Sequence, residues 1–227
     1  MSCRAILLAA ALAASMACGT RETPVESPVT RPSKILDFNV LYAKNCAGCH
    51  GRDGKGGAAI PLADPVYLAI ADDAAITRIT ADGVPRTSMP AFAQHSGGML
   101  TDDQIRVIVA GIRVHWAKPD AVRDANPPPY KAENPGDATR GAEVYGTYCS
   151  SCHGAGGKGG QKASSIVDGS YLTLASDQGL RTTVIIGRPD MGAPDWRANV
   201  AGKPMSPQDV SDVVAWLAAQ RPEGVNR

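Results

Sequence analysis

The feature that most constrains this chain is a short motif, Cys-x-x-Cys-His, which occurs twice. Its copies run from Cys46 to His50 and from Cys149 to His153, 103 positions apart. The glycine-rich segments that follow, GRDGKGG and GAGGKGG, repeat at the same offset. Internal repetition of this kind indicates two tandem units of one fold, because 227 residues accommodate two domains of about 100 residues each.

The repeat continues beyond the motif and sets the domain boundaries. The matching pairs include Asp64/Asp168, Gly83/Gly187, Pro90/Pro194 and Ile105/Val210. We therefore predict one domain over 35–117 and a second over 138–222. Residues 118–137 separate them and contain three consecutive prolines, which favour an extended, stiff linker.

Each unit has a helical pattern and no strand pattern. We expect a helix entering each motif, at 38–46 and 142–149, and a middle helix at 73–81 and 178–186. A last helix starts after Thr101 and after Ser206, where Gln104 and Asp209 stand at the position that completes a capping box. Apolar residues at helical spacing follow both starts. The predicted fold class is all-α.

The motif itself indicates covalently bound haem. Two thiols at this spacing reach the two vinyl groups of one haem, and the adjacent histidine presents an imidazole to the iron. A zinc site would need a further pair of thiols or imidazoles in each unit, and a dithiol redox site needs no adjacent histidine. We therefore predict two haems c, attached at Cys46 and Cys49 and at Cys149 and Cys152, with His50 and His153 as proximal ligands.

Composition agrees with a cofactor at the centre of each unit and argues against some partners. Aromatic residues make up 5% of the chain, too few for a thick side-chain core in two small domains. The net charge of +1 gives no global field that would recruit nucleic acid.

The first residues predict export. Residues 1–17 carry Arg4 and then an apolar run that ends in small residues, as a signal peptide does, and the run is too short for a stable membrane anchor. Ser15-Met16-Ala17-Cys18 is similar to a bacterial lipoprotein processing site, so we expect lipidation at Cys18; ordinary cleavage after Ala17 is the alternative. Residues 18–34 are predicted to be a disordered tether.

From residue 35 onward, the chain resembles tandem class I cytochromes c, such as the dihaem carriers and cytochrome subunits of bacterial respiratory chains. The resemblance implies a methionine thioether as the sixth iron ligand, on a loop before the last helix. Met89, followed by Pro90, fits that position in the first unit, with Met99, His95 and His115 as alternatives. It also implies a proline carbonyl, here Pro61, as the acceptor for the proximal imidazole.

The second unit departs from this pattern. At the offset of 104, Met89 aligns with Ala193. Met191 lies two residues upstream, and Met205 lies just before the cap of the last helix. We favour Met205 as the sixth ligand, with Met191 as the alternative and a five-coordinate or differently ligated haem as a third possibility.

The resemblance implies a periplasmic electron carrier without a substrate of its own. Its partners would be a redox donor and acceptor, including a terminal oxidase or a membrane respiratory complex, and only an N-terminal lipid would attach it to the membrane. The alternative is a dihaem enzyme, peroxidase-like or oxidising sulfur compounds, with an open site at the second haem.

Overall fold

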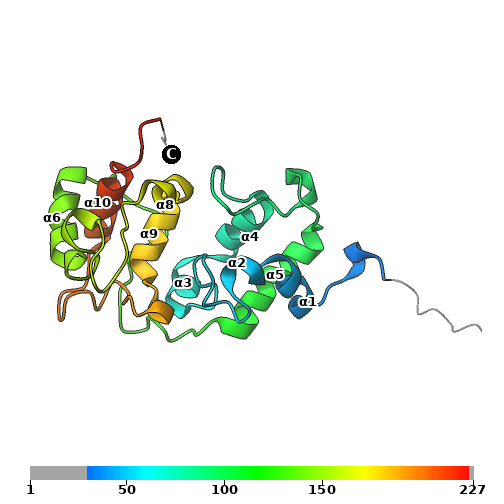
Figure 1. Ribbon diagram of the computed structural model, residues 1–227. Helices are drawn as coiled ribbons and strands as arrows, with labels where there is room; N and C mark the ends of the chain where they lie inside the picture. Colours follow the sequence, from blue (N-terminus) through cyan, green and yellow to red (C-terminus); the bar gives the residue numbers. More distant parts are fainter. Residues whose placement is uncertain (1–29, 225–227) are drawn as a thin grey trace, which may run out of the picture. The chain divides into compact units, whose positions relative to one another are not determined.

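The computed structural model describes residues 30–224, and every regular element among them is a helix, accompanied by two isolated bridges (Figure 1). The predicted all-α class is therefore confirmed. We call residues 35–117 the first repeat and 138–222 the second repeat. The helices of the first repeat are α1 (Phe38–Asn45), α2 (Ala47–His50), α3 (Pro65–Ile70), α4 (Asp73–Asp82) and α5 (Asp102–Trp116). Those of the second are α6 (Ala138–Tyr148), α7 (Ser150–His153), α8 (Gly169–Leu174), α9 (Asp177–Ile186) and α10 (Pro207–Ala218).

The last helix of each repeat begins at the predicted cap. Thr101 Oγ1 accepts from the Gln104 amide at 3.3 Å, and the Gln104 side chain accepts from the Thr101 amide at 3.0 Å. Ser206 and Asp209 form the same reciprocal pair at 3.1 and 2.9 Å. Such a box satisfies two backbone donors that a helix start leaves unpaired. Both capping boxes are thus confirmed.

Two short helices were not expected from the sequence. The Asp64 carboxylate accepts from the amides of Val66 and Tyr67, both at 2.9 Å, and starts α3. Asp168 starts α8 in the same way, at 2.9 and 3.1 Å. Each helix spans only six residues, which is too short for an apolar period to be recognised.

The first and last helices of each repeat pack closely, and glycine makes this possible. A Cβ on Gly141 of α6 would lie 2.1 Å from the Asp212 carbonyl oxygen of α10, and one on Gly111 of α5 would lie 2.0 Å from the Phe38 ring of α1. The apolar face of α5 is buried behind this contact, as is that of α10. The buried residues are Ile105, Ile108 and Ile112, and Val210, Val213 and Leu217.

The linker contacts the second repeat. Arg181 of α9 is 3% exposed and donates to the carbonyl of Pro129 at 2.8 Å and to that of Tyr130 at 3.2 Å. Gln178 also donates to Tyr130, at 2.8 Å. The proline-rich segment is therefore held against α9 by its backbone carbonyls.

The last residues of the predicted tether are helical. Pro32–Lys34 form a 3-10 turn, and Gln104 donates to the carbonyls of Pro32 and Ile35 at 2.8 and 3.1 Å. The predicted signal peptide at 1–17 and Cys18 lie outside the described residues. Within residues 30–224, no helix combines the length and the apolar character needed to cross a membrane.

Candidate haem-binding sites

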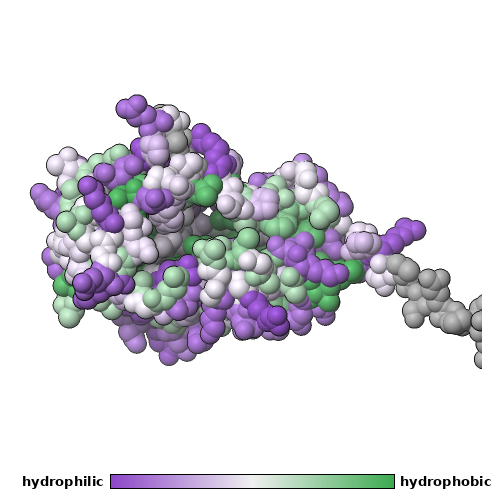
Figure 2. All heavy atoms as spheres, in the orientation of Figure 1, coloured by the Kyte–Doolittle hydropathy of each residue, from purple (hydrophilic) through white to green (hydrophobic). Residues whose placement is uncertain are grey.

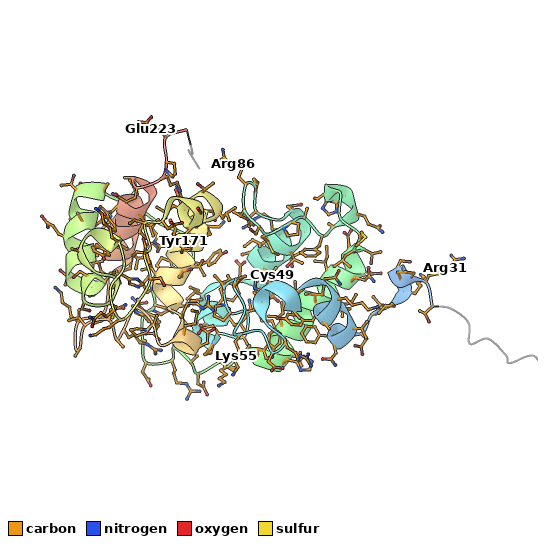
Figure 3. All side chains as sticks on the ribbon, viewed as in Figure 1. Arg31, Cys49, Lys55, Arg86, Tyr171 and Glu223 are labelled. Atoms are coloured by element: carbon orange, nitrogen blue, oxygen red, sulfur yellow. The ribbon has the colours of Figure 1, made fainter. Side chains whose placement is uncertain are left out.

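Each Cys-x-x-Cys-His motif forms one helical turn at the end of the first helix of its repeat. Cys46 caps α1, and its carbonyl accepts from the amides of Cys49 and His50 at 3.2 and 3.0 Å. The Cys149 carbonyl accepts from Cys152 and His153 at the same two distances. Both thiols and the imidazole are thereby gathered on one turn, with Cys49 shown on α2 in Figure 3.

The two thiols of each motif have different surroundings. Cys46 is buried while Cys49 is exposed, and all four cysteines of the motifs are free thiols. Burial, with a smaller contribution from the neighbouring Cys49, raises the pKa of Cys46 to about 11. Burial and Cys152 raise the pKa of Cys149 to about 11 as well. Cys46 and Cys149 are therefore protonated thiols at neutral pH.

A backbone carbonyl orients each histidine. His50 Nδ1 lies 2.8 Å from the Ile60 carbonyl oxygen, and His153 Nδ1 lies 2.9 Å from that of Ser164. Because a carbonyl only accepts, Nδ1 carries the hydrogen and Nε2 keeps its lone pair for a metal. The acceptor in the first repeat is Ile60, so the prediction of Pro61 is wrong by one residue. Burial of His50 lowers its pKa, against the opposing effect of the Ile60 carbonyl.

The glycine-rich segments form the turns beside the motifs. Gly51 and Gly154 have φ of 83° and 74°, a left-handed conformation in which a Cβ would lie 1.8 and 2.1 Å from a backbone oxygen. The Tyr42 hydroxyl donates to the Gly51 carbonyl at 2.8 Å, and Tyr145 donates to Gly154. A tyrosine on the entering helix thus fixes the chain just after each histidine.

Met89 lies on the loop after α4, and hydrogen bonds close that loop. The Val84 amide donates to the Met89 carbonyl at 3.0 Å, and the Phe92 amide returns to the Ala81 carbonyl at 3.1 Å. Met89 is half-buried, while Arg86 lies at the outer tip (Figure 3). Hydrophobic surface gathers over α2 and α4 on the face shown in Figure 2.

The three alternatives to Met89 as a sixth ligand are either exposed or in contact with other side chains. Met99 is 83% exposed. His95 lies 3.6 Å from Asp82 and 3.5 Å from Asp102, and His115 stacks on Phe38 with ring centroids 4.7 Å apart.

The two methionines of the second repeat lie in contrasting places. Met205 is 3% exposed, and its amide donates to the Trp196 carbonyl at 2.9 Å. Met191 is 73% exposed, at the end of a 3-10 turn, Pro189–Met191. Trp196 is buried at 2% exposure, whereas Tyr171 is 41% exposed.

The donor set of each repeat fits a haem c. One turn supplies two free thiols and an imidazole whose Nε2 is available, which is the set that covalent haem attachment requires. Among the described residues, no three His, Cys, Asp or Glu side chains gather into a metal-binding cluster.

Known cytochrome c subunits are similar to this chain in sequence. The cytochrome bc1 complex cytochrome c subunit of Mycobacterium tuberculosis is 24% identical over 218 residues, which cover 93% of this chain and 73% of the relative. The cbb3-type cytochrome c oxidase subunit FixP of Azorhizobium caulinodans is 27% identical over 218 residues, covering 92% of this chain and 68% of the relative. The chain is therefore similar to cytochrome c subunits over nearly its whole length.

A solved structure and a protein family also match. The reducing HAO-like protein complex of Kuenenia stuttgartiensis aligns with 82% of this chain and 96% of the matched chain, at 17% identity and a TM-score of 0.47. The family described as cytochrome c oxidase, cbb3-type, subunit III matches residues 34–110 and 136–217. Since these two tandem segments make up most of the chain, it belongs to the cbb3-type subunit III family of cytochrome c domains, whose haem c is bound covalently.

Proposed function

We propose that the chain is a dihaem cytochrome c that passes single electrons between partners of a respiratory chain. The observation that carries the proposal is the pair of motifs, each with two free thiols and a histidine oriented by a backbone carbonyl. Cys46, Cys49 and His50 would hold one haem, and Cys149, Cys152 and His153 the other. A bound haem supplies an iron that cycles between two oxidation states.

The protein's own residues would set the properties of these centres. The Ile60 and Ser164 carbonyls hold the imidazoles and raise their basicity as ligands. In the first repeat, Met89 would provide the sixth ligand, since its loop is closed by backbone hydrogen bonds and its side chain is half-buried. A thioether favours the reduced iron and raises the potential. Such a centre exchanges electrons and binds no substrate.

The relatives and the N-terminal sequence support a proposal for the cellular location and the partners of this chain. The named relatives are subunits of a cytochrome bc1 complex and a cbb3-type oxidase. We propose that this chain likewise works with a membrane respiratory complex, in the periplasm, after removal of residues 1–17 and with a lipid on Cys18. Cell fractionation of the unaltered protein and of Cys18→Ala tests the anchor: the variant is expected in the soluble periplasmic fraction, and retention in the membrane would contradict a lipid at this residue.

Haem counting tests the central claim. We expect two haems per chain in the purified protein, and one in each of two double variants, Cys46→Ser with Cys49→Ser, and Cys149→Ser with Cys152→Ser. A reductive titration should then resolve two one-electron steps in the unaltered protein and one in each variant. A double variant that retains both haems would refute attachment at the residues that it removes.

A second candidate function is favoured by one observation, the alanine that stands at position 193 where the first repeat has Met89. A haem without a protein ligand on one side can bind small molecules, as a dihaem enzyme of the peroxidase or sulfur-oxidising kind requires. Turnover of peroxide or thiosulfate by the purified protein would support this candidate.

A further inference from the structure

The loops that follow α4 and α9 share several backbone hydrogen bonds. In the first repeat, the Val84 amide donates to the Met89 carbonyl at 3.0 Å; in the second, the Arg188 amide donates to the Ala193 carbonyl at 3.0 Å. The glycines before them, Gly83 and Gly187, have φ of 68° and 66°. At both, an added Cβ would lie 2.7 Å from the carbonyl oxygen of Met89 or Ala193. Ala193 therefore occupies the position of Met89.

Met191 corresponds to a different residue of the first loop. Its amide donates to the Arg188 carbonyl at 2.8 Å, just as the Thr87 amide donates to the Val84 carbonyl at 3.2 Å. Met191 is thus the counterpart of Thr87, two residues before the ligand position.

The turn that carries Met191 is also anchored. Arg188 donates to the Asp190 carboxylate at 3.0 Å and to the Gly57 carbonyl at 2.9 Å, while the Gly56 amide donates to Asp190 at 3.1 Å. Both side chains are largely buried, at 17% and 12% exposure. Moving Met191 two positions along the loop would break this set of hydrogen bonds, so the fold holds Met191 at the Thr87 position.

Met205 corresponds to a packing residue. Its amide donates to the Trp196 carbonyl at 2.9 Å, as the Leu100 amide donates to the Phe92 carbonyl at 2.7 Å. Both side chains are buried, at 3% and 6% exposure, directly before the cap of the last helix. Leucine has no lone pair, so the role that this position has in the first repeat is hydrophobic packing. The expectation that Met205 is a ligand gains no support from this equivalence.

Histidine offers no substitute. The chain has four histidines, and only His153 belongs to the second repeat. We propose that the second repeat presents neither a thioether nor a second imidazole opposite His153. A haem held at Cys149 and Cys152 then has a sixth position open to water and to small exogenous ligands, such as carbon monoxide on reduced iron or cyanide on oxidised iron. This inference rests on the proposed attachment of haem to both repeats.

The test compares spin states and ligand binding in the full-length holoprotein. We expect electron paramagnetic resonance of the oxidised protein to show one low-spin and one high-spin haem, and carbon monoxide to bind only one of the two reduced haems. Met191→Ala and Met205→Leu should leave both results unchanged, the leucine preserving packing as Leu100 does. Met89→Ala, the positive control, should abolish the long-wavelength thioether-to-iron band entirely, because no second thioether contributes to it.

Restoring the missing ligand gives the complementary result. Ala193→Met should convert the high-spin haem to low-spin, add a second thioether band and abolish carbon monoxide binding. Two low-spin haems in the unaltered protein would overturn the inference, and loss of one in Met191→Ala or Met205→Leu would identify the ligand. Haem counting separates this failure from failure of the proposed function. Two haems per chain, both low-spin, refute only the open position. One haem per chain that persists when Cys149 and Cys152 are both replaced by serine refutes attachment at the second motif and the open position with it.

Discussion

At the scale of single residues, Thr87 determines how Met89 is held. Its hydroxyl donates to the Val84 carbonyl at 2.8 Å and accepts from the Met89 amide at 3.1 Å. One side chain thereby ties both arms of the loop together, directly beside Met89. The counterpart in the second repeat, Met191, has no hydroxyl and cannot make this link.

Replacing Thr87 by valine keeps the shape of the side chain and removes both hydrogen bonds. Each such bond contributes about 1 kcal/mol to stability, so the free energy that keeps the loop closed around Met89 should fall by about 1–3 kcal/mol. We expect the thioether band of Thr87→Val to disappear at a lower urea concentration than in the unaltered protein, while the haem content stays the same. Thr147→Val is the matched control, because the Thr147 hydroxyl bonds only to the carbonyl one turn back, at 3.0 Å. Equal urea midpoints for Thr87→Val and the control would contradict this role.

At the scale of helices, Asp212 joins the two ends of the second repeat. Its side chain is 1% exposed and accepts from the Asp137 amide at 2.8 Å, from Gln208 at 2.9 Å and from Arg140 at 2.6 Å. Burial alone would raise the pKa of this carboxyl, but the hydrogen bonds and the charge of Arg140 together lower it. Since Asp137 caps α6, the carboxylate fixes the start of α6 to α10.

Asp212→Asn should destabilise the holoprotein by about 2–4 kcal/mol at neutral pH, because an amide leaves the buried donors poorly paired. A carboxyl group whose pKa is lowered by folding stabilises the folded state at pH values above its pKa in the unfolded chain, which is about 3.9. The difference between the two proteins should therefore be largest above pH 4 and shrink as the pH falls through the lower value of the folded state. Urea unfolding across this range measures it. The exposed pair Arg106–Asp103 offers the control Asp103→Asn, expected within about 0.5 kcal/mol of the unaltered protein.

The sequence predicted those elements and site residues that have a local signature. Residues close together in the sequence form the capping boxes at Thr101 and Ser206, and the same is true of the Cys-x-x-Cys-His turns. The sequence predicts the helix that enters the second motif from residue 142, whereas α6 begins four residues earlier. Asp137 caps this helix well before its apolar residues, so the apolar pattern alone misses its first turn. The acceptors for the histidines could not be read, since Ile60 and Ser164 act through their backbone carbonyls, which every residue has.

At the scale of the whole molecule, Arg181 determines how the linker is held. Three consecutive prolines predicted a stiff spacer, yet the guanidinium also donates to the carbonyls of Pro129 and Tyr130 and to Ser211 at 3.2 Å. Proline lacks an amide hydrogen but keeps its carbonyl, so a buried cation can organise such a segment where a backbone ladder cannot. Burial lowers the pKa of Arg181, partly offset by Glu133.

Arg181→Met should release the linker without unfolding α9, since methionine fills similar space but donates no hydrogen bonds. We expect a glutamate-specific protease to cut after Glu133 more rapidly than in the unaltered protein, and cleavage after Glu143 of α6 to remain unchanged. Arg106→Met, on an exposed helix face, should leave the digestion pattern as it is. Cleavage after Glu133 that is as slow in Arg181→Met as in the unaltered protein would show that the prolines alone hold the segment.

The contact of Gly56 and Gly57 with Arg188 and Asp190 joins residues 134 and 131 positions apart. Contacts between such distant positions form late, because they wait for everything between them to be made and folded. During synthesis, the loop beside the first motif is therefore complete long before its distant partners exist. The first repeat can therefore fold while Gly56 and Gly57 still lack these partners, and the contact joins the two repeats only after the second has formed.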